Sequence, residues 1–132
     1  MGSTSFNAGS SVVLDNQGSV YCSGYFYGTP DFDPGTGVYN LYSSGNSDVF
    51  MLKLDSAGNF GWARSVGGNG SDEGNLYHDQ QGSIYLAGDF TGTADFNPAS
   101  GVTSYTSNGN ADAFILKLSA CQPTTSTISA TA

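Results

Sequence analysis

The stretch that decides the fold is residues 48–54, which read Asp-Val-Phe-Met-Leu-Lys-Leu. Side chains of a β-strand alternate between the two faces of its sheet, and here both faces are apolar. Phe50 and Leu52 share one face, and Val49 and Met51 share the other. A short strand that is apolar on both faces is covered on both sides. Residues 48–54 therefore predict a strand in a sheet that has a neighbouring layer on each face.

The same pattern returns 64 residues later, where residues 112–118 read Asp-Ala-Phe-Ile-Leu-Lys-Leu. Between residues 15–54 and 79–118, 22 of 40 positions are identical. The offset also aligns a Gly-Thr-x-Asp-Phe segment at 28–32 with one at 92–96. This degree of identity establishes an internal duplication, and fixed-period repeats indicate an architecture of stacked units.

Composition excludes several classes of protein. The 132 residues carry 3 Lys+Arg against 11 Asp+Glu, for a formal net charge of −8. Three basic residues cannot neutralise a phosphate backbone, so no nucleic-acid partner is expected. Nineteen glycines together with a 13% aromatic content argue against a helical chain and against disorder. The sequence contains no run of 18 apolar residues, so no membrane-spanning helix is expected.

The local sequence predicts an all-β unit with tight turns. We expect two hairpins, or one four-stranded antiparallel meander, in the first copy. The expected strands are 11–14, 19–26, 48–54 and 59–66, with turns at 15–18 and 55–58. A long excursion between the second and third strands carries Asp31-Phe32-Asp33-Pro34. Because proline cannot sit in a central strand, this excursion is predicted to be a loop or a sheet edge.

A four-stranded sheet stacked between copies of itself is the geometry of a β-propeller blade. A β-sandwich or a β-solenoid is the competing fold. The predicted organisation is a lead-in or cloning remnant at 1–9, a first repeat at 10–67, a second repeat at 68–119 and a Ser/Thr-rich tail at 120–132. The second repeat lacks an obvious fourth strand. Residues 126–131 are read as a closing strand, a linker or a strand donated to a neighbouring chain.

Three motifs carry a family resemblance. They are Trp62 to Gly68 with its terminal Gly-Gly, Asp79 to Gly88 with the pattern Asp-x-x-Gly-x-x-Tyr-x-x-Gly, and Asp112 to Lys117 with Asp-x-Phe-x-x-Lys. They resemble the bacterial SBBP-type β-propeller repeat, over about residues 10–119. The resemblance implies a surface or extracellular bacterial protein and no catalytic residues. The two copies of the excursion differ, since Asp33 in the first corresponds to Asn97 in the second.

Two blades are too few for a closed propeller, which needs about four to eight. Isolated blades would expose apolar faces and strand edges. The sequence therefore predicts a homo-oligomer: a trimer with six blades, a tetramer with eight, or an open polymer. A fragment of a longer propeller is the alternative.

The excursion is also the candidate metal site. Asp31 and Asp33, with Asp95 and Asn97 in the second copy, offer oxygen ligands of the kind that Ca²⁺ prefers. The alternative is that these side chains cap turns by accepting hydrogen bonds from nearby backbone amides. Ca²⁺ is the one cofactor that the sequence suggests.

Aromatic residues of the same loops are candidate ligand contacts. Tyr39, Tyr42 and Tyr105 could stack on a glycan, and core packing is the alternative use. Asp48 and Asp112, which open the third strand of each copy, are interpreted as turn-capping residues. Asp72, on a Gly-Ser-Asp-Glu-Gly stretch, is interpreted as a solvated loop residue.

The remaining candidates suggest no catalysis. His78 is the one histidine and is read as a surface or partly packed strand residue. Cys22 and Cys121 fit either one disulfide or two free thiols. The favoured function is a structural or interaction module outside the cell, and the chain is not expected to be an enzyme. The alternatives are a carbohydrate- or ligand-binding module and a glycosidase-like propeller, which would need a pair of carboxylates in a pocket.

Overall fold

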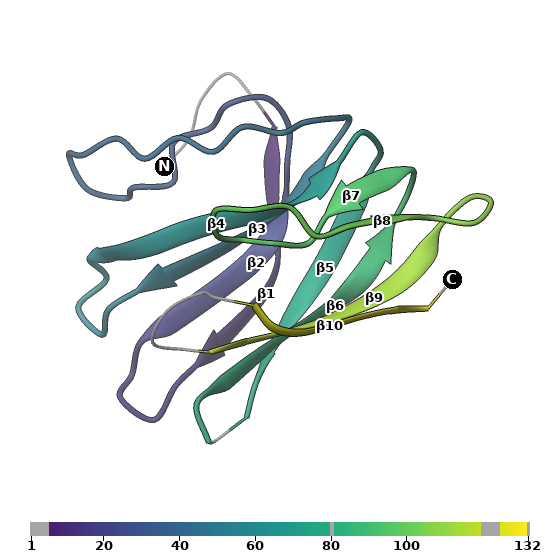
Figure 1. The fold of residues 1–132 in the computed structure, drawn as a ribbon. Coiled ribbons are helices and arrows are strands. Elements are labelled where there is room, and N and C mark those ends of the chain that lie inside the picture. Colours follow the sequence, from purple (N-terminus) through teal and green to yellow (C-terminus); the bar gives the residue numbers. More distant parts are fainter. Residues whose placement is uncertain (1–5, 80, 120–124, 132) are drawn as a thin grey trace.

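The computed structural model describes residues 6–79, 81–119 and 125–131. The described residues form β-strands, turns and loops, with no helix among them. The strands build two antiparallel sheets, and a face of one sheet packs against a face of the other (Figure 1). The all-β prediction is confirmed. Within the described ranges, no helix has the length and apolar character needed to cross a lipid bilayer.

The first sheet is a meander extended by a short hairpin. Its strand order is β1-β2-β3-β4-β7-β8. The bounds are β1 (Asn7–Leu14), β2 (Val20–Phe26), β3 (Asp48–Leu54), β4 (Phe60–Gly68), β7 (Thr93–Asp95) and β8 (Ser104–Thr106). Strand β1 begins at Asn7 rather than at Ser11, so the first strand starts inside the predicted lead-in. The four consecutive strands β1 to β4 are the meander that the sequence predicts.

Both predicted tight turns are present in the first repeat. The backbone amide of Gly18 donates to the carbonyl of Asp15, and that of Gly58 donates to the carbonyl of Asp55. Both glycines have positive φ, at 80° and 85°, which L side chains rarely adopt. The aspartates fix the turns by accepting amide hydrogen bonds on their own side chains.

The second sheet repeats the meander. Its order is β10-β9-β6-β5, with bounds β5 (Asp72–His78), β6 (Ser83–Phe90), β9 (Asp112–Ser119) and β10 (Thr125–Thr131). Strand β10 pairs antiparallel with β9 of the same chain, at the edge of the second sheet.

The register of β10 differs from that of β4. Ala63 lies opposite Leu52 in the first sheet, and the 64-residue offset would place Thr127 opposite Leu116. The structure instead places Ile128 opposite Leu116. This is a slip of one residue, and such a slip exchanges the faces to which the residues of a strand belong.

The excursion takes different forms in the two copies. In the first repeat it is a loop with one isolated bridge, between Asp31 and Asn40. In the second repeat it forms the β7–β8 hairpin, which pairs with Gly67 and Gly68 at the end of β4. The prediction of a loop or a sheet edge therefore holds in both copies. The hairpin also joins the second repeat to the first sheet.

Each meander has two faces, which we name by the parity of the residues on its first three strands. The odd face of the first sheet carries Val13, Tyr21, Ser23, Val49 and Met51, and the even face carries Val12, Cys22, Phe50, Leu52 and Leu54. Because the repeat offset is even, the same naming applies to the second sheet. Its odd face carries Tyr77, Tyr85, Ala87, Ala113 and Ile115, and its even face carries Leu76, Leu86, Phe114, Leu116 and Leu118.

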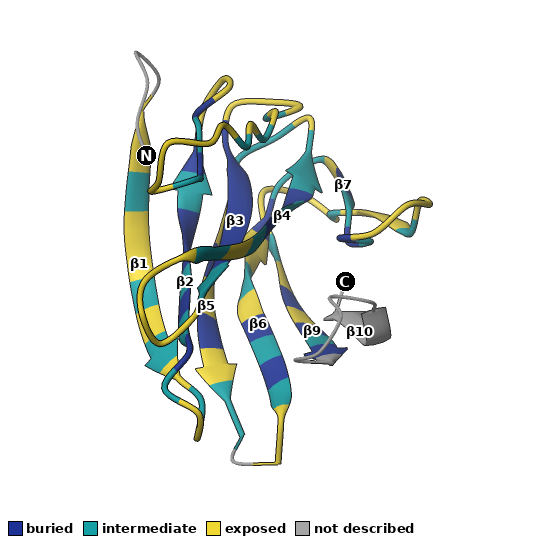
Figure 2. Cartoon of the chain, turned by 90° about the vertical axis from the view of Figure 1, so that its left-hand side faces the viewer, coloured by how far each residue is buried: buried dark blue, intermediate teal, exposed yellow. Residues whose placement is uncertain are grey.

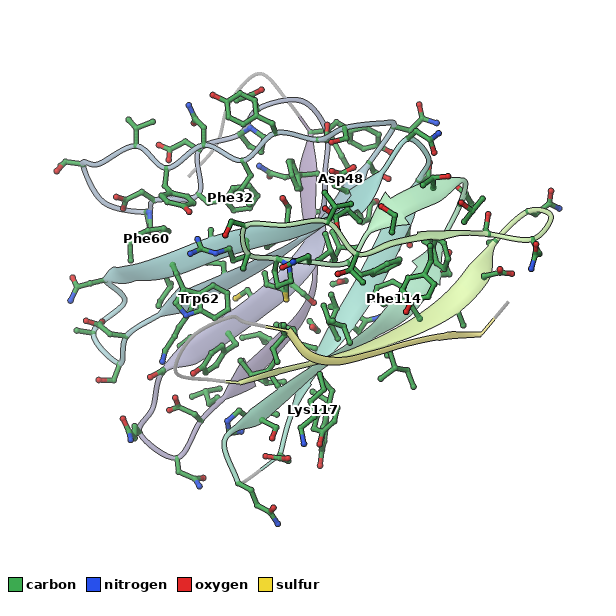
Figure 3. All side chains as sticks on the ribbon, viewed as in Figure 1. Phe32, Asp48, Phe60, Trp62, Phe114 and Lys117 are labelled. Atoms are coloured by element: carbon green, nitrogen blue, oxygen red, sulfur yellow. The ribbon has the colours of Figure 1, made fainter. Side chains whose placement is uncertain are left out.

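The core lies between the odd face of the first sheet and the even face of the second. Tyr21, Val49 and Met51 share one buried cluster with Leu86 and Leu116. A second cluster covers part of the even face of the first sheet, where Phe32 and Phe60 lie against Phe50 and Leu52 (Figure 3). The faces that meet are therefore not equivalent ones.

Within the single chain, the third strand is covered on both faces in the first copy, as expected, and on only one face in the second. Residues Asp48 to Leu52 of β3 are all buried. In β9, Phe114 and Leu116 are buried, whereas Ala113 and Ile115 are exposed. Buried and exposed residues likewise alternate along β5 and β6 (Figure 2). No described element packs on the odd face of the second sheet.

Candidate interaction faces and loop sites

The even face of the first sheet carries an open apolar hollow. A cavity of about 210 Å³ is lined there by residues 7–9 and by Cys22, Asp31, Phe32, Phe50, Leu52 and Leu54. In the second sheet the equivalent positions, such as Leu86 and Leu118, are fully buried because the first sheet covers them.

Exposure at β1 shows the same contrast. Val12 is 60% exposed on the first sheet, whereas its repeat equivalent Leu76 is 7% exposed. Leu14 is also exposed, and it is the equivalent of His78. Val12 and Leu76 are thus both apolar and differ in coverage, whereas Leu14 is replaced by a histidine in the second copy.

The odd face of the second sheet is exposed to solvent, whereas the odd face of the first sheet is buried. Ile115 is 54% exposed, whereas its equivalent Met51 has no exposed surface. Tyr77 is exposed as well, and its equivalent Val13 packs against the core. An apolar residue that is buried in one copy thus lies in solvent in the other.

Hydrogen bonds tie the two sheets together at β5. The hydroxyl groups of Ser10 and Ser23 donate to the carbonyl of Gly74, at 2.8 Å and 3.1 Å. The backbone amide of Leu76 donates to Oγ of Ser11, at 2.8 Å. Polar groups buried between packed faces are satisfied in this way, so the contact is specific as well as apolar.

Two buried aspartates lie where the first repeat meets the second. Asp48 begins β3 (Figure 3), and Asp72 begins β5. They are 3% and 1% exposed, respectively. Gly67 lies between them: a β-carbon added there would lie 2.7 Å from Cγ of Asp48 and 2.8 Å from Oδ2 of Asp72.

The carboxyl groups of this pair differ in how well they are bonded. Asp72 accepts hydrogen bonds from the amides of Gly68 and Thr91. Asp48 accepts one from Ser44 on Oδ2, and its buried Oδ1 has no partner among the described residues. Burial raises the pKa of each carboxyl group to about 6, with Asp72 adding to the effect on Asp48 and Asp89 to that on Asp72.

The interpretation of Asp72 as a solvated loop residue is wrong. Strand β5 begins at Asp72 itself, so its side chain points into the sheet contact while that of Glu73 points to solvent. The turn-capping role of Asp48 and Asp112 is present, since their Oδ2 atoms accept from the amides of Ser44 and Asn108. Asp72 corresponds to Ala8 in the first copy, so the repeat gave no signal for its burial.

A cleft of about 280 Å³ opens between the loops of the two repeats beside Asp48. It brings Tyr42 and Arg64 of the first repeat together with Asp95 and Asn97 of the second. Of the sequence-predicted residues, therefore, Tyr42, Asp95 and Asn97 meet in one place. Asp33 lines a separate hollow beside Phe60.

The carboxylates proposed for Ca²⁺ bond to backbone amides. Oδ1 of Asp31 accepts from Asp33 and Tyr39, and Oδ1 of Asp95 accepts from Asn97 and Thr103. The amides of Tyr39 and Asp33 lower the pKa of Asp31 below its ordinary value.

Asp33 and Asn97 follow the same pattern, each accepting from the amide two residues further on. Within the described ranges, no group of three or more His, Cys, Asp or Glu side chains could hold a metal ion. The arrangement is that of turn capping, and the Ca²⁺ site stays a prediction.

The three candidate tyrosines have different surroundings. The hydroxyl of Tyr39 accepts a 2.6 Å hydrogen bond from Arg64, and its ring packs on Phe60. Tyr105 packs edge-on against Phe96. Tyr42 is exposed at the cleft. Tyr42 is therefore the one of the three whose ring is presented to solvent over a concave surface.

The remaining singled-out residues belong to the contact between the sheets or lie near it. His78 is half-buried, with its ring stacked on Tyr21 at 5.9 Å between centroids. Trp62 packs edge-on against the same ring. Cys22 is a free, half-buried thiol, and Cys121 lies outside the described residues, so their pairing stays a prediction.

Comparison with protein-family models, with curated proteins and with solved structures finds no match to this chain.

Proposed function

We propose that this chain is a structural and interaction module of a bacterial surface or extracellular protein. In this proposal its two meanders are propeller-type blades, and copies of the chain associate through blade faces into a closed ring or an open polymer. The proposed role is non-catalytic. The resemblance of its repeat motifs to the SBBP-type family supports the bacterial and extracellular assignment.

The observation that carries the proposal is the non-equivalence of the two packed faces. In a self-contained sandwich of two repeats related by a twofold axis, the same face of each copy would turn inward. Here the odd face of one repeat meets the even face of the next. A contact between different faces leaves one of each kind unused, and such a contact propagates until a ring closes or a filament grows.

The mass of the particle in solution tests this proposal. Light scattering or sedimentation over a range of concentrations should give multiples of the 13.6 kDa chain. Three chains would correspond to six blades and four chains to eight, while a mass that keeps rising with concentration would indicate a polymer. A single 13.6 kDa species up to about millimolar concentration would overturn the proposal of self-association.

The inter-repeat cleft favours one second candidate, a carbohydrate-binding module. Exposed aromatic rings stack on sugars, and carboxylate and guanidinium groups bind hydroxyls. Tyr42, Asp95 and Arg64 offer these three groups around one cleft. Tyr27→Ala changes another exposed tyrosine of the first repeat and is the control. This candidate would be supported if glycan-array binding is lost in Tyr42→Ala and retained in Tyr27→Ala. Equal loss in both variants, or no binding at all, would remove it.

A further inference from the structure

We infer that a second copy of this chain docks head to tail, placing the odd face of its second sheet on the even face of the first sheet. The contact reproduces between chains the packing that joins the two repeats within one chain. This inference rests on the proposed function and adds to it the two surfaces, their order and the residues that meet.

A buried residue of the contact between the sheets has an exposed equivalent on the second sheet. Met51 on the odd face of the first sheet is buried in the same cluster as Leu86 and Leu116. The repeat equivalent of Met51 is Ile115, and the equivalents of Leu86 and Leu116 are Cys22 and Leu52.

Ile115 is exposed on the odd face of the second sheet, on the inner strand β9. Cys22 and Leu52 line the open apolar hollow on the first sheet. A chain docked in the same geometry places Ile115 at the contact with that hollow, as Met51 lies in the buried cluster that joins the two sheets within the chain.

The aromatic contact of Tyr21 also has an equivalent on the second sheet. Tyr21 stacks on His78 of the second sheet, and the ammonium group of Lys53 lies 5.0 Å from the centre of its ring. Tyr85 is the equivalent of Tyr21, and Lys117 lies 5.3 Å from the centre of the Tyr85 ring. The ring of Tyr85 is therefore held as that of Tyr21 is.

The position that His78 occupies in the intrachain contact belongs to Leu14 in the first repeat. Leu14 is exposed on β1, whose surface is open along most of its length (Figure 2). An apolar side chain below a tyrosine ring removes water from both surfaces. Between two chains, the contact of Tyr85 with Leu14 would be the equivalent of the contact of Tyr21 with His78 within one chain.

The charges at one end of the contact also favour docking of a second copy. Within the chain, the contact places Asp48 beside Asp72, and both are buried. The equivalent pair between chains is Asp112 and Ala8, so the docked contact contains no like-charge pair at this point. Substitution of the second carboxylate by a methyl group removes the cost of burying a second carboxylate at this position.

The residues equivalent to the serines that bond to β5 are also compatible with docking. Ser11 and Ser23, which bond to β5, correspond to Asn75 and Ala87 on the docking face. The Asn75 amide can both donate and accept, as the Ser11 hydroxyl does. Ala87 is small and apolar, which suits a position facing another sheet.

A pair of complementary blocked variants tests the order of the faces. Val12→Asp blocks the even face of the first sheet, and Ile115→Asp blocks the odd face of the second. Each variant alone should remain at 13.6 kDa at concentrations where the unmodified chain associates, because a buried unpaired carboxylate weakens such a contact by about a hundredfold or more.

The mixture gives the decisive result. The Ile115→Asp chain keeps an open even face and the Val12→Asp chain keeps an open odd face, so together they should form a one-to-one dimer and nothing larger. If equal faces paired, one of the variants would dimerise by itself, and the inference would be overturned.

Matched controls separate the site from general effects of charge. Val38→Asp and Val102→Asp change equally exposed valines on the excursion loops, and both should associate as the unmodified chain does. If Val12→Asp or Ile115→Asp loses the β-sheet circular dichroism of the folded chain, Leu14→Asp and Tyr77→Asp block the same two faces at other exposed positions.

Two failures can be told apart. Association of the unmodified chain that neither blocking variant weakens would overturn the head-to-tail contact and leave the proposed function standing. Absence of association in the unmodified chain at any concentration would overturn both.

Discussion

At the scale of single residues, the junction between the repeats depends on Asp48 and Asp72. Their pKa values lie near 6 in the folded chain, above the ordinary 3.8, so the folded chain binds protons more tightly than the unfolded chain does. The resulting stabilisation is complete below about pH 3.8 and is lost as the pH rises through about 6. Unlike most buried carboxylates with good partners, this pair weakens the fold at neutral pH.

Asp48→Asn should therefore stabilise the chain at pH 7.5. The new side chain keeps an oxygen for the amide of Ser44 and presents an NH₂ group where Oδ1 has no partner among the described residues. We expect a gain of about 1–2 kcal/mol at pH 7.5 and a smaller gain at pH 5, where the native carboxyl group is largely protonated. Thermal melts at both pH values, at concentrations where the chain is monomeric, provide the measurement.

Asp112→Asn makes the same chemical change at the equivalent position of the second repeat, away from the Asp72 carboxylate. This control should leave the difference in stability between pH 5 and pH 7.5 as it is in the unmodified chain. Asp89 and Arg64 also lie near the junction, and they are unchanged in both variants. If the two variants behaved alike, the pH dependence would not come from the Asp48–Asp72 pair.

A second residue-scale prediction concerns Asp31. Because Oδ1 accepts from two amides, Asp31→Ala should cost about 1–2 kcal/mol, whereas Asp31→Asn should cost less since it keeps an acceptor oxygen. If turn capping is the whole role, millimolar Ca²⁺ or a chelator should leave the melting temperature unchanged. A rise with Ca²⁺ that Asp31→Asn abolishes would instead establish the calcium site.

At the scale of elements, the β1–β2 pair depends on one glycine in mid-strand. A β-carbon on Gly24 would overlap the carbonyl of Ala8 and lie 2.8 Å from the ring of Phe50. Since a backbone carbonyl cannot move aside cheaply, Gly24→Ala should destabilise the chain by about 2–3 kcal/mol. Gly9→Ala, in the paired strand, meets nothing within 4 Å and should change stability little. Denaturant unfolding of both variants checks this, and equal effects would contradict it.

The same elements show what the sequence could predict. Alternating apolar residues and turn glycines located the meander strands, because local pattern and tertiary burial agree there. Identity between the copies carried these assignments from β3 to β9. The register of β10 could not be predicted from the sequence, because its segment lacks counterparts of Trp62 and Arg64. The pairing of β10 with β9 differs from the one that the 64-residue offset gives.

The role of a candidate-site residue can be predicted from the sequence only where both copies carry the same residue at that position. The turn role of Asp48 follows from its recurrence as Asp112, whereas the burial of Asp72 has no counterpart in the first repeat. The one-sided coverage of β9 could not be read from its apolar pattern. That pattern records which faces suit burial, and the number of neighbours present decides which faces are buried.

At the scale of the whole molecule, the net charge of −8 opposes association of identical chains. The docking face adds to this opposition, because Glu73 and Asp89 are exposed beside Tyr85 and Ile115. The surfaces that meet are otherwise mainly apolar. Salt should therefore strengthen the contact, by screening the repulsion while leaving the apolar burial in place.

Raising the ionic strength from about 0.01 M to about 1 M shortens the screening length from about 30 Å to about 3 Å. We expect the dissociation constant between chains to fall by about tenfold over this range. Glu73→Gln should give part of the same gain at low salt, because it removes a repelling charge from the docking face. Asp33→Asn removes one negative charge from the excursion loop beside Phe60 rather than from the odd face of the second sheet, and it should give less. Sedimentation of the three proteins at both ionic strengths measures these changes, and weaker association at high salt would show that attraction between charges, rather than apolar burial, holds the chains together.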